Sequence, residues 1–408
     1  MPRRRVFITA IGMVSPLGDT AAGTFDALLA GRCGVGKHPD AAVDKQVGVI
    51  REPLVVDATP SQLRSMDRVA LLAQYAAGRA LADAALTTDQ QRECGVFVGT
   101  GIGGVSSLTE AVEIHHGLAP RHTFLVVPSV MPNAAAAQIA QTLRSTAEAQ
   151  TYATACSAGA VAIGEAFRRI RDGYLDVAIA GGTESMLTEI ILRAWKQLHV
   201  LCADMTDDAS AGGCRPFSAR RTGFALAEGA AMLVLESEAH ARVRNAVAIA
   251  EVVGYGVSND GTHPLRPDDV GQALAMARCL ADAGLTPSDI GYINAHGTGT
   301  YVGDRIETTA IKRVFGDRVG AVPVSSIKGA LGHTIGAAGA IEAAVTALSV
   351  QQAVVPPTLF FEAGDDQCDL DYVPDAARPL PELEAAISNS FGMGGNNAVL
   401  AFRKARLR

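Results

Sequence analysis

The sequence predicts an α/β protein built from two similar halves. Short apolar runs that are typical of buried strands alternate with helical segments, which indicates a mostly parallel sheet with helices on both faces. The chain has 408 residues, of which 48% are hydrophobic, so it can bury a large core. A new strand begins near residue 246 and the alternation then resumes. We therefore divide the chain into residues 1–245 and 246–408, with internal duplication as the simplest origin.

Composition excludes several classes of function. The net charge of −7 argues against general nucleic-acid binding. Seven cysteines without CxxC spacing imply neither a disulfide framework nor a zinc site, so we expect a protein of the reducing cytoplasm. The most membrane-like stretch, residues 329–350, contains His333, Glu342 and several glycines. We therefore expect a buried, tightly packed helix there and no contact with a membrane.

The first half begins with an expected strand at residues 6–11 and a long alanine-rich helix at 66–86. Arg64 and Arg68 lie near the start of this helix, and the apolar pattern places both in solvent.

A buried strand at 94–98 runs into a glycine-rich turn at 99–104 that has GxGxxG spacing. A dinucleotide site would need a second strand ending in an acidic residue about twenty positions later, but the segment that follows is helical. We therefore expect the glycines to serve packing. Further buried strands are expected at 176–180 and 231–235.

Cys156 is the strongest candidate for a reactive group. It lies among small residues at 153–160, immediately before a helix whose apolar face recurs at helical spacing. The positive end of a helix lowers the pKa of a thiol and favours a nucleophile near neutral pH. A lone cysteine is more often a buried structural residue, but small neighbours leave room for a substrate to approach the sulfur.

Two polar stretches of the second half lie in apolar surroundings. One is a strand that ends at His296, followed by Asp304 and Glu307, which have the spacing of a capping box for a helix at 305–315. The other contains Lys328 and His333. A single histidine after a strand is usually a core residue, but two histidines with a lysine that would be costly to bury favour catalysis. A third stretch, 388–397, is a glycine-rich loop near the C-terminus that allows close approach of the backbone.

Four motifs together carry a resemblance. In order they are Thr154-Ala-Cys-Ser-Ala-Gly159, Asn294-Ala-His-Gly-Thr-Gly-Thr300 with Gly303-Asp304, Ser326-Ile-Lys328 through Leu331-Gly-His333, and the loop from Ser388 to Asn396. With this order and spacing, the chain resembles an elongating-type β-ketoacyl-[acyl-carrier-protein] synthase of the thiolase superfamily over residues 6–402. The resemblance implies a thiolase-like five-layer αβαβα fold, two duplicated halves and a dimer.

The resemblance also implies a reaction, the decarboxylative condensation of an acyl chain on Cys156 with a malonyl-acyl-carrier protein. His296 and His333 would stabilise the enolate and Lys328 would hold them in place. The backbone N–H groups of Cys156 and Met393 would form the oxyanion hole. Supporting carboxylates would be Asp304, Glu307 and Glu342, and the residues that contact the substrate would be Thr298, Thr300, Ile102, Trp195, Phe391 and Met393. No metal or other cofactor is implied, because 4'-phosphopantetheine arrives on the acyl-carrier protein.

The partners and the pathway remain open at this stage. Arg64 matches a carrier-docking position of the family, and Arg68 and Arg121 are further candidates. Met393 and Trp195 stand where the family usually has phenylalanine, which puts the substrate length in doubt more than the reaction. The chain fits a homodimer in fatty-acid synthesis, or a type II polyketide or polyene ketosynthase paired with a Cys-less chain-length partner. A non-catalytic scaffold or partner subunit is the remaining alternative.

Overall fold

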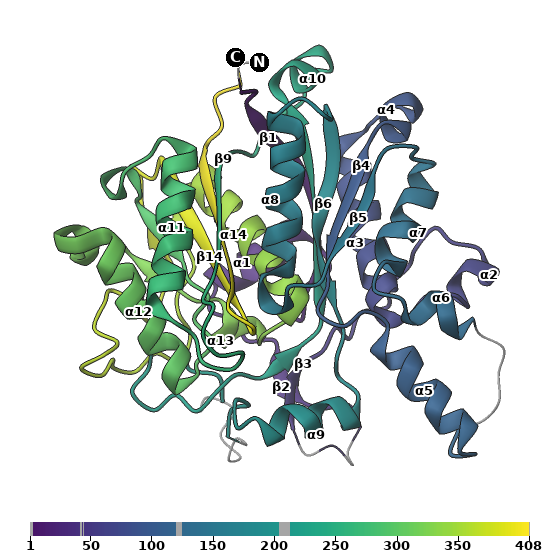
Figure 1. Cartoon of the computed structure of the whole chain (residues 1–408), viewed down its shortest axis with the longest axis horizontal. Coiled ribbons are helices and arrows are strands. Elements are labelled where there is room, and N and C mark those ends of the chain that lie inside the picture. Colours follow the sequence, from purple (N-terminus) through teal and green to yellow (C-terminus); the bar gives the residue numbers. More distant parts are fainter. Residues whose placement is uncertain (1–2, 41–42, 44, 120–124, 204–212, 408) are drawn as a thin grey trace.

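The computed structural model describes residues 3–40, 43, 45–119, 125–203 and 213–407 (Figure 1). Ten strands form one large sheet in the order β11-β10-β14-β15-β9-β1-β8-β6-β4-β5. Their bounds are β1 Val6–Val14, β4 Gly95–Gly99, β5 Ala149–Tyr152, β6 Val177–Glu184, β8 Gly229–Ser237, β9 Ala250–Asn259, β10 Tyr292–Asn294, β11 Val324–Ser325, β14 Ala385–Gly392 and β15 Asn396–Lys404.

The sheet consists of two five-stranded halves with the same topology. The first half has the order β5-β4-β6-β8-β1 and the second has β11-β10-β14-β15-β9, so each strand has a counterpart in the other half. The halves join where β1 pairs with β9 through Val6, Phe7 and Ile8. The prediction of a mostly parallel sheet was wrong. Strands β4, β5 and β6, like β10, β11 and β14, pair in parallel, but β8 and β15 return antiparallel to their neighbours.

Helices cover the outer faces of both halves of the sheet and fill the space between the halves (Figure 1). One core cluster joins the inner faces of both halves to α8 Ala158–Arg171 and α14 Ala338–Gln352. A second cluster packs α3 Arg68–Ala84 and α7 Ala134–Leu143 on the outer face of the first half. A third packs α11 Asp269–Ala283 and α12 Tyr301–Phe315 on the outer face of the second half. The predicted five-layer αβαβα fold is therefore confirmed.

The remaining elements are short and mostly lie at the edges of these layers. They are α1 Ala21–Leu29, β2 Val35–Lys37, β3 Gln46–Gly48, α2 Pro60–Leu63, α4 Thr88–Arg92, α5 Val105–His115, α6 Val126–Val130, η1 Ala155–Ser157, α9 Glu189–Gln197, β7 Leu226–Ala227, α10 Glu238–Val243, η2 Pro287–Asp289, η3 Gly316–Ala321, α13 Lys328–Leu331, η4 Ile335–Ala337, β12 Val354–Val355 and β13 Arg378–Pro379.

Glycines bring the two central helices into close contact at their N-termini. A Cβ added to Gly159 would lie 2.7 Å from the backbone nitrogen of Ala340, and one added to Gly339 would lie 2.8 Å from that of Ala160. A Cβ on Gly99 would lie 2.2 Å from the backbone of Ala158, so the turn after β4 serves packing, as expected. This close approach places the starts of α8 and α14 side by side. Among the described residues, no helix is long and apolar enough to cross a membrane.

Candidate active site

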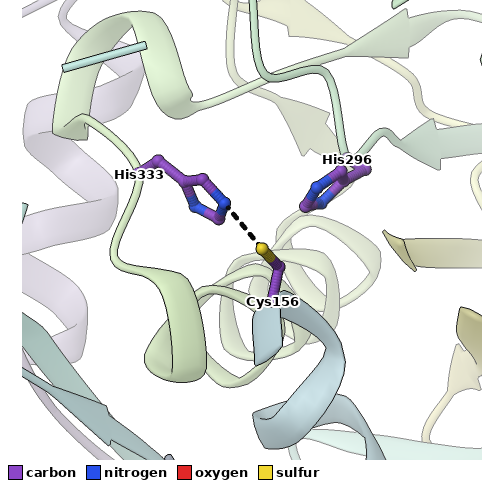
Figure 2. A group of neighbouring side chains, drawn as sticks. All are labelled: Cys156, His296 and His333. Atoms are coloured by element: carbon purple, nitrogen blue, oxygen red, sulfur yellow. Dashed lines mark hydrogen bonds between the residues drawn. The ribbon is translucent and has the colours of Figure 1, made fainter. Parts of the chain in front are cut away.

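Cys156 meets two histidines of the second half beside the adjacent starts of α8 and α14 (Figure 2). Cys156 lies in η1 directly before α8 and is 6% exposed. Its Sγ is 3.1 Å from Nε2 of His333, and the ligand-type atoms of Cys156, His296 and His333 all lie within 4.8 Å of one another. Ala155 before the cysteine and Ile335 after His333 both have left-handed backbones, with φ of 52° and 43°. Non-glycine residues adopt this conformation at a cost, and such strain concentrates at functional sites.

Hydrogen bonds fix the tautomers of both histidines. The N–H of Ile335 donates to Nδ1 of His333 at 3.3 Å, and Nζ of Lys328 lies 3.4 Å from Nδ1 of His296. Each Nδ1 therefore accepts, which leaves the proton on Nε2. Burial, and secondarily the charge of Lys328, lowers the pKa of both histidines well below its usual value, so both rings are neutral. The site thus presents two neutral Nε2–H donors beside one sulfur.

The pKa of the Cys156 thiol is shifted in the direction opposite to the one that the sequence predicts. Burial raises the pKa of Cys156 to about 11, although N–H groups of Met393 and of Cys156 itself and the charge of Lys328 act in the opposite direction. The predicted lowering of its pKa at the helix start was therefore wrong, because desolvation outweighs the helix end. The N–H groups of Met393 and Cys156 that act on the sulfur are the two that the resemblance assigns to the oxyanion hole.

The loop that carries Met393 is a tight turn between β14 and β15. Gly394 and Gly395 have φ of 82° and 75°, which glycine adopts without strain. A Cβ on Gly392 would lie 3.3 Å from the backbone nitrogen of Cys156, so the turn lies directly against the nucleophile.

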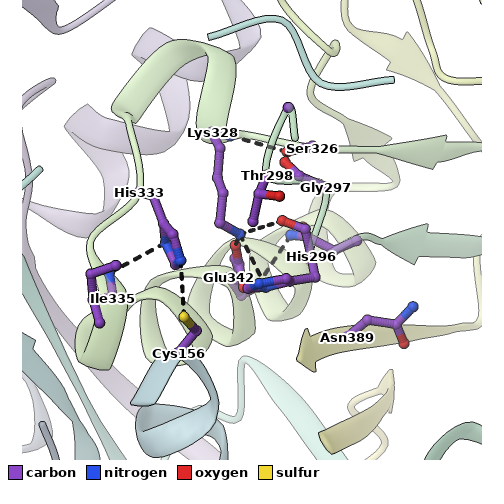
Figure 3. Close-up of polar contacts among 12 residues, drawn as sticks. Cys156, His296, Gly297, Thr298, Ser326, Lys328, His333, Ile335, Glu342 and Asn389 are labelled. Atoms are coloured by element: carbon purple, nitrogen blue, oxygen red, sulfur yellow. Dashed lines mark hydrogen bonds and ion pairs between the residues drawn. The ribbon is translucent and has the colours of Figure 1, made fainter. Parts of the chain in front are cut away.

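Lys328 forms a buried network behind the histidines (Figure 3). It is 1% exposed, and its Nζ donates to the carbonyl oxygen of His296 and to Oε1 of Glu342, which lies on α14. Burial raises the pKa of Glu342 to about 7, while the adjacent lysine opposes that rise. A buried ion pair is costly to form, and removing one member leaves an uncompensated charge. The ion pair between Lys328 and Glu342 holds Nζ of Lys328 against the carbonyl oxygen and the ring of His296.

Asp304 and Glu307 hold the loop that follows His296, so the predicted capping box was wrong. Helix α12 begins at Tyr301, with the side chain of Thr300 as its cap, and both carboxylates lie inside the helix. Glu307 accepts the N–H groups of His296 and Gly297 at 2.8 and 2.7 Å and Nδ2 of Asn389 at 3.1 Å.

Asp304 supports the same loop further along. It accepts the N–H groups of Phe217 at 2.6 Å and Gly299 at 3.0 Å. Burial raises the pKa of Asp304 to about 7 and also raises that of Glu307. Both residues therefore act as positioning groups for His296.

A cavity of about 380 Å³ leads from the surface to Cys156. It is lined by five of the predicted substrate residues, namely Thr298, Thr300, Trp195, Phe391 and Met393. Trp195 stacks edge-on against Phe224 with ring centroids 5.7 Å apart, and Phe224 meets His333 in the same way at 4.9 Å. Ile102 does not line this cavity and is 46% exposed.

The comparisons with known proteins agree with this geometry. Residues 3–241 match the model of the "Beta-ketoacyl synthase, N-terminal domain" and residues 249–362 that of the "Beta-ketoacyl synthase, C-terminal domain". The chain belongs to the β-ketoacyl synthase family.

Relatives of this synthase chain align over almost its whole length. Nodulation protein E of Rhizobium sp. (strain N33) is 39% identical over 98% of the chain and 99% of the relative. The 3-oxoacyl-[acyl-carrier-protein] synthase 2 of Staphylococcus aureus (strain COL) is 37% identical over 98% of both proteins.

Solved structures show the same likeness. The ishigamide ketosynthase/chain length factor has a TM-score of 0.91 at 32% identity, over 99% of the chain and 100% of that structure. A β-ketoacyl synthase from Burkholderia phymatum STM815 has a TM-score of 0.90 at 34% identity, with the same coverage.

The three arginines predicted to dock the carrier lie in different surroundings in this synthase chain. Arg64 is exposed at the end of α2. Arg68 is not free in solvent, contrary to the prediction, because its guanidinium pairs with both oxygens of Glu228 at 2.7 and 3.0 Å and with the carbonyl of Ile50. Arg121 lies outside the described residues.

Among the residues that line the synthase cavity and that sequence reasoning missed are Phe224 and Gln272. The only signal for Phe224 in the sequence is the glycine that precedes it, and nothing in the sequence marks Gln272.

A further set of buried oxygens behind the site has no hydrogen-bond partner within the described part of the chain; these are Asn294 Oδ1, Glu342 Oε2, Ser388 Oγ and Asn389 Oδ1. Oxygen groups of this kind suit a bound water or a hard cation. The Cys156, His296 and His333 donors could hold a softer metal.

Proposed function

We propose that the chain catalyses the decarboxylative condensation of an acyl chain with a malonyl-acyl-carrier protein to give a β-ketoacyl-acyl-carrier protein. The observation that carries this proposal is the convergence of one thiol and two neutral Nε2–H donors at the buried end of a cavity. A thiol can hold the acyl chain as a thioester. Two fixed donors can stabilise the negative oxygen of an enolate.

The first half-reaction is acyl transfer to Cys156. Its sulfur attacks the acyl carbonyl carbon, the oxyanion is bound by the N–H groups of Cys156 and Met393, and the carrier thiolate leaves. The proton of the Cys156 thiol goes to that departing sulfur. The acyl chain then remains on Cys156 and the carrier leaves with a free thiol on its 4'-phosphopantetheine arm.

The second half-reaction forms the carbon–carbon bond. A malonyl thioester loses carbon dioxide, and the electrons of the broken bond form an enolate whose oxygen is held by His296 and His333. The enolate carbon attacks the acyl carbonyl on Cys156, and the carbon–sulfur bond breaks. The thiolate of Cys156 takes a proton from water as the β-ketoacyl product leaves on the carrier. No step requires a metal or redox group.

The direct test is intact-mass analysis after incubation with a panel of acyl-carrier substrates. We expect a single acyl adduct that maps to Cys156 and disappears when malonyl carrier is added, with release of carbon dioxide. An adduct on another residue would contradict the proposal. The panel would also show which chain lengths and which carrier the protein accepts, and hence whether it serves fatty-acid or polyketide synthesis.

A partner-subunit function is the second candidate, because two solved structures similar to the chain are complexes of a ketosynthase with a chain length factor. The presence of Cys156 with both histidines favours the catalytic member of such a pair. A dimer is supported by exposed apolar side chains on and beside α5 and α6; they are Ile102, Leu108, Val112, Val127 and Met131. The dimer pairs two identical chains, or this chain with a Cys-less one.

Carrier docking should depend on Arg64. Acyl carriers are acidic and the chain carries −7 overall, so local positive charge is needed for rapid encounter. Arg64→Glu should raise the KM for carrier substrates several-fold and weaken their salt dependence, while acylation by a small thioester stays unchanged. Arg318→Glu, at an exposed arginine in η3, is the matched control. Unchanged carrier kinetics for Arg64→Glu would exclude this surface.

Substrate length should respond to Trp195 and not to Met393. Trp195 is a large rigid wall of the cavity, whereas Met393 is a flexible side chain in the turn beside Cys156. Trp195→Phe should shift the preferred chain length gradually, since one methylene is worth about 1–3 kcal/mol in an apolar pocket. Met393→Phe should change the acylation rate with little shift in length. Competition among carriers with graded chains, read by mass spectrometry, tests both; the reverse pattern would exchange the two roles.

A further inference from the structure

Gln272 is a buried polar residue whose side chain has no partner in the described part of the chain. It lies near the start of α11 and is 2% exposed. Its backbone N–H donates to the carbonyl of Asp268 within the helix. Among the described residues its Oε1, which is fully buried, accepts no hydrogen bond, and its Nε2 donates none. The surrounding helix face is apolar and packs in the outer core through Ala273 and Met276. An amide in such a place is unfavourable unless something pairs with it.

The side chain forms part of the wall of the cavity that ends at Cys156. Several other polar groups in this wall are already paired. The hydroxyls of Thr298 and Thr300 bond each other at 2.9 Å, and Nδ2 of Asn397 donates to Asp260 at 2.6 Å. Gln272 adds to this wall a carboxamide whose Oε1 is fully buried and whose Nε2 is an unused donor.

We propose that Gln272 is a substrate-binding residue whose carboxamide pairs with a secondary amide of the molecule that enters the cavity. The Nε2 group of a carboxamide is a donor, and the carbonyl oxygen of a secondary amide is the matching acceptor. This inference rests on the proposed function, because a substrate on a 4'-phosphopantetheine arm brings two such amides past the wall of the cavity. An amide within the acyl chain has the same chemistry, and the experiment separates the two sources.

The test is Gln272→Leu, which keeps a similar volume and removes both polar atoms. We expect its melting temperature to equal or exceed that of the unchanged protein, because an unpaired buried amide is lost. We expect the KM for an acyl-pantetheine thioester to rise about tenfold, as for the loss of one or two hydrogen bonds. The KM for the same acyl group on a simple alkanethiol, which has no amide, should stay unchanged. A loss that appears only with alkanethiol esters of amide-containing acyl chains would assign the contact to the acyl chain.

Gln74→Leu is the matched control, because Gln74 is also buried, with an unpaired Oε1, but lies on α3 away from the cavity. It should leave the KM of every thioester unchanged. The inference is overturned if Gln272→Leu leaves the KM of all thioesters within twofold, or if it lowers the melting temperature, which would mark a structural role. Failure of the proposed function would be distinguishable, because the wild-type protein would then form no acyl adduct on Cys156.

Discussion

Replacing Cys156 by alanine should abolish condensation, with a loss of activity of at least about 10⁴-fold, because no other described residue that lines the cavity has a thiol to hold the acyl chain as a thioester. The two histidines keep their donors in this variant, since Nδ1 of each is fixed by Lys328 or by Ile335. Cys156→Ala should therefore still release carbon dioxide from malonyl carrier at a measurable rate. Acyl loading and carbon dioxide release, followed in the same sample, separate the two half-reactions.

Cys33→Ala is the control for this experiment, because Cys33 is the exposed cysteine among those described. It should load and condense normally. An acyl adduct that survives in Cys156→Ala would remove Cys156 from the mechanism.

Replacing either histidine by alanine should separate loading from condensation. The oxyanion of the loading step is held by backbone N–H groups, whereas the enolate of the second step depends on the two Nε2–H donors. His296→Ala and His333→Ala should therefore still form the acyl adduct while condensation falls about 10²–10³-fold, the usual cost of losing one such donor. Single-turnover acylation and steady-state product formation measure the two effects.

A conservative variant sharpens this result. His333→Asn keeps an N–H donor near the same place and should retain more condensation than His333→Ala. A His333→Ala protein that elongates at the normal rate would exclude this residue from the reaction.

The pH profile gives an independent check on the histidines. Burial lowers the pKa of both well below 6.5, so they stay neutral as the pH falls through the range in which an exposed histidine would gain a proton. Condensation of a preloaded acyl enzyme should therefore show no loss of rate as the pH falls through 6.5. A decline with a midpoint near 6.5 would mean that at least one ring is accessible to solvent and titrates normally.

The sequence predicted which residues gather at the candidate site because each lies in a local motif. Cys156 precedes a helix, His296 ends a strand, and Lys328 and His333 share one short segment. The structure brings all four together.

Predictions that depended on contacts distant in sequence were the ones that were wrong. Asp304 and Glu307 fit a capping box locally, yet their carboxylates are used by the loop after His296 and by Phe217. Arg68 fits an exposed helix position, yet its partner Glu228 is far along the chain. The pKa of Cys156 depends on a degree of burial that no local pattern reveals.

The joining of the halves explains why the site lies where it does. Helices α8 and α14 are counterparts, each preceded by a short turn that begins with a left-handed residue, Ala155 or Ile335. Cys156 belongs to one turn, and His333 lies two residues before the other. An ancestor with only one half would have needed two copies to build this junction, and its symmetry would have given both turns the same side chains. Joining the two copies in one chain allows the two turns to carry different side chains, so that one half presents the thiol and the other the imidazole.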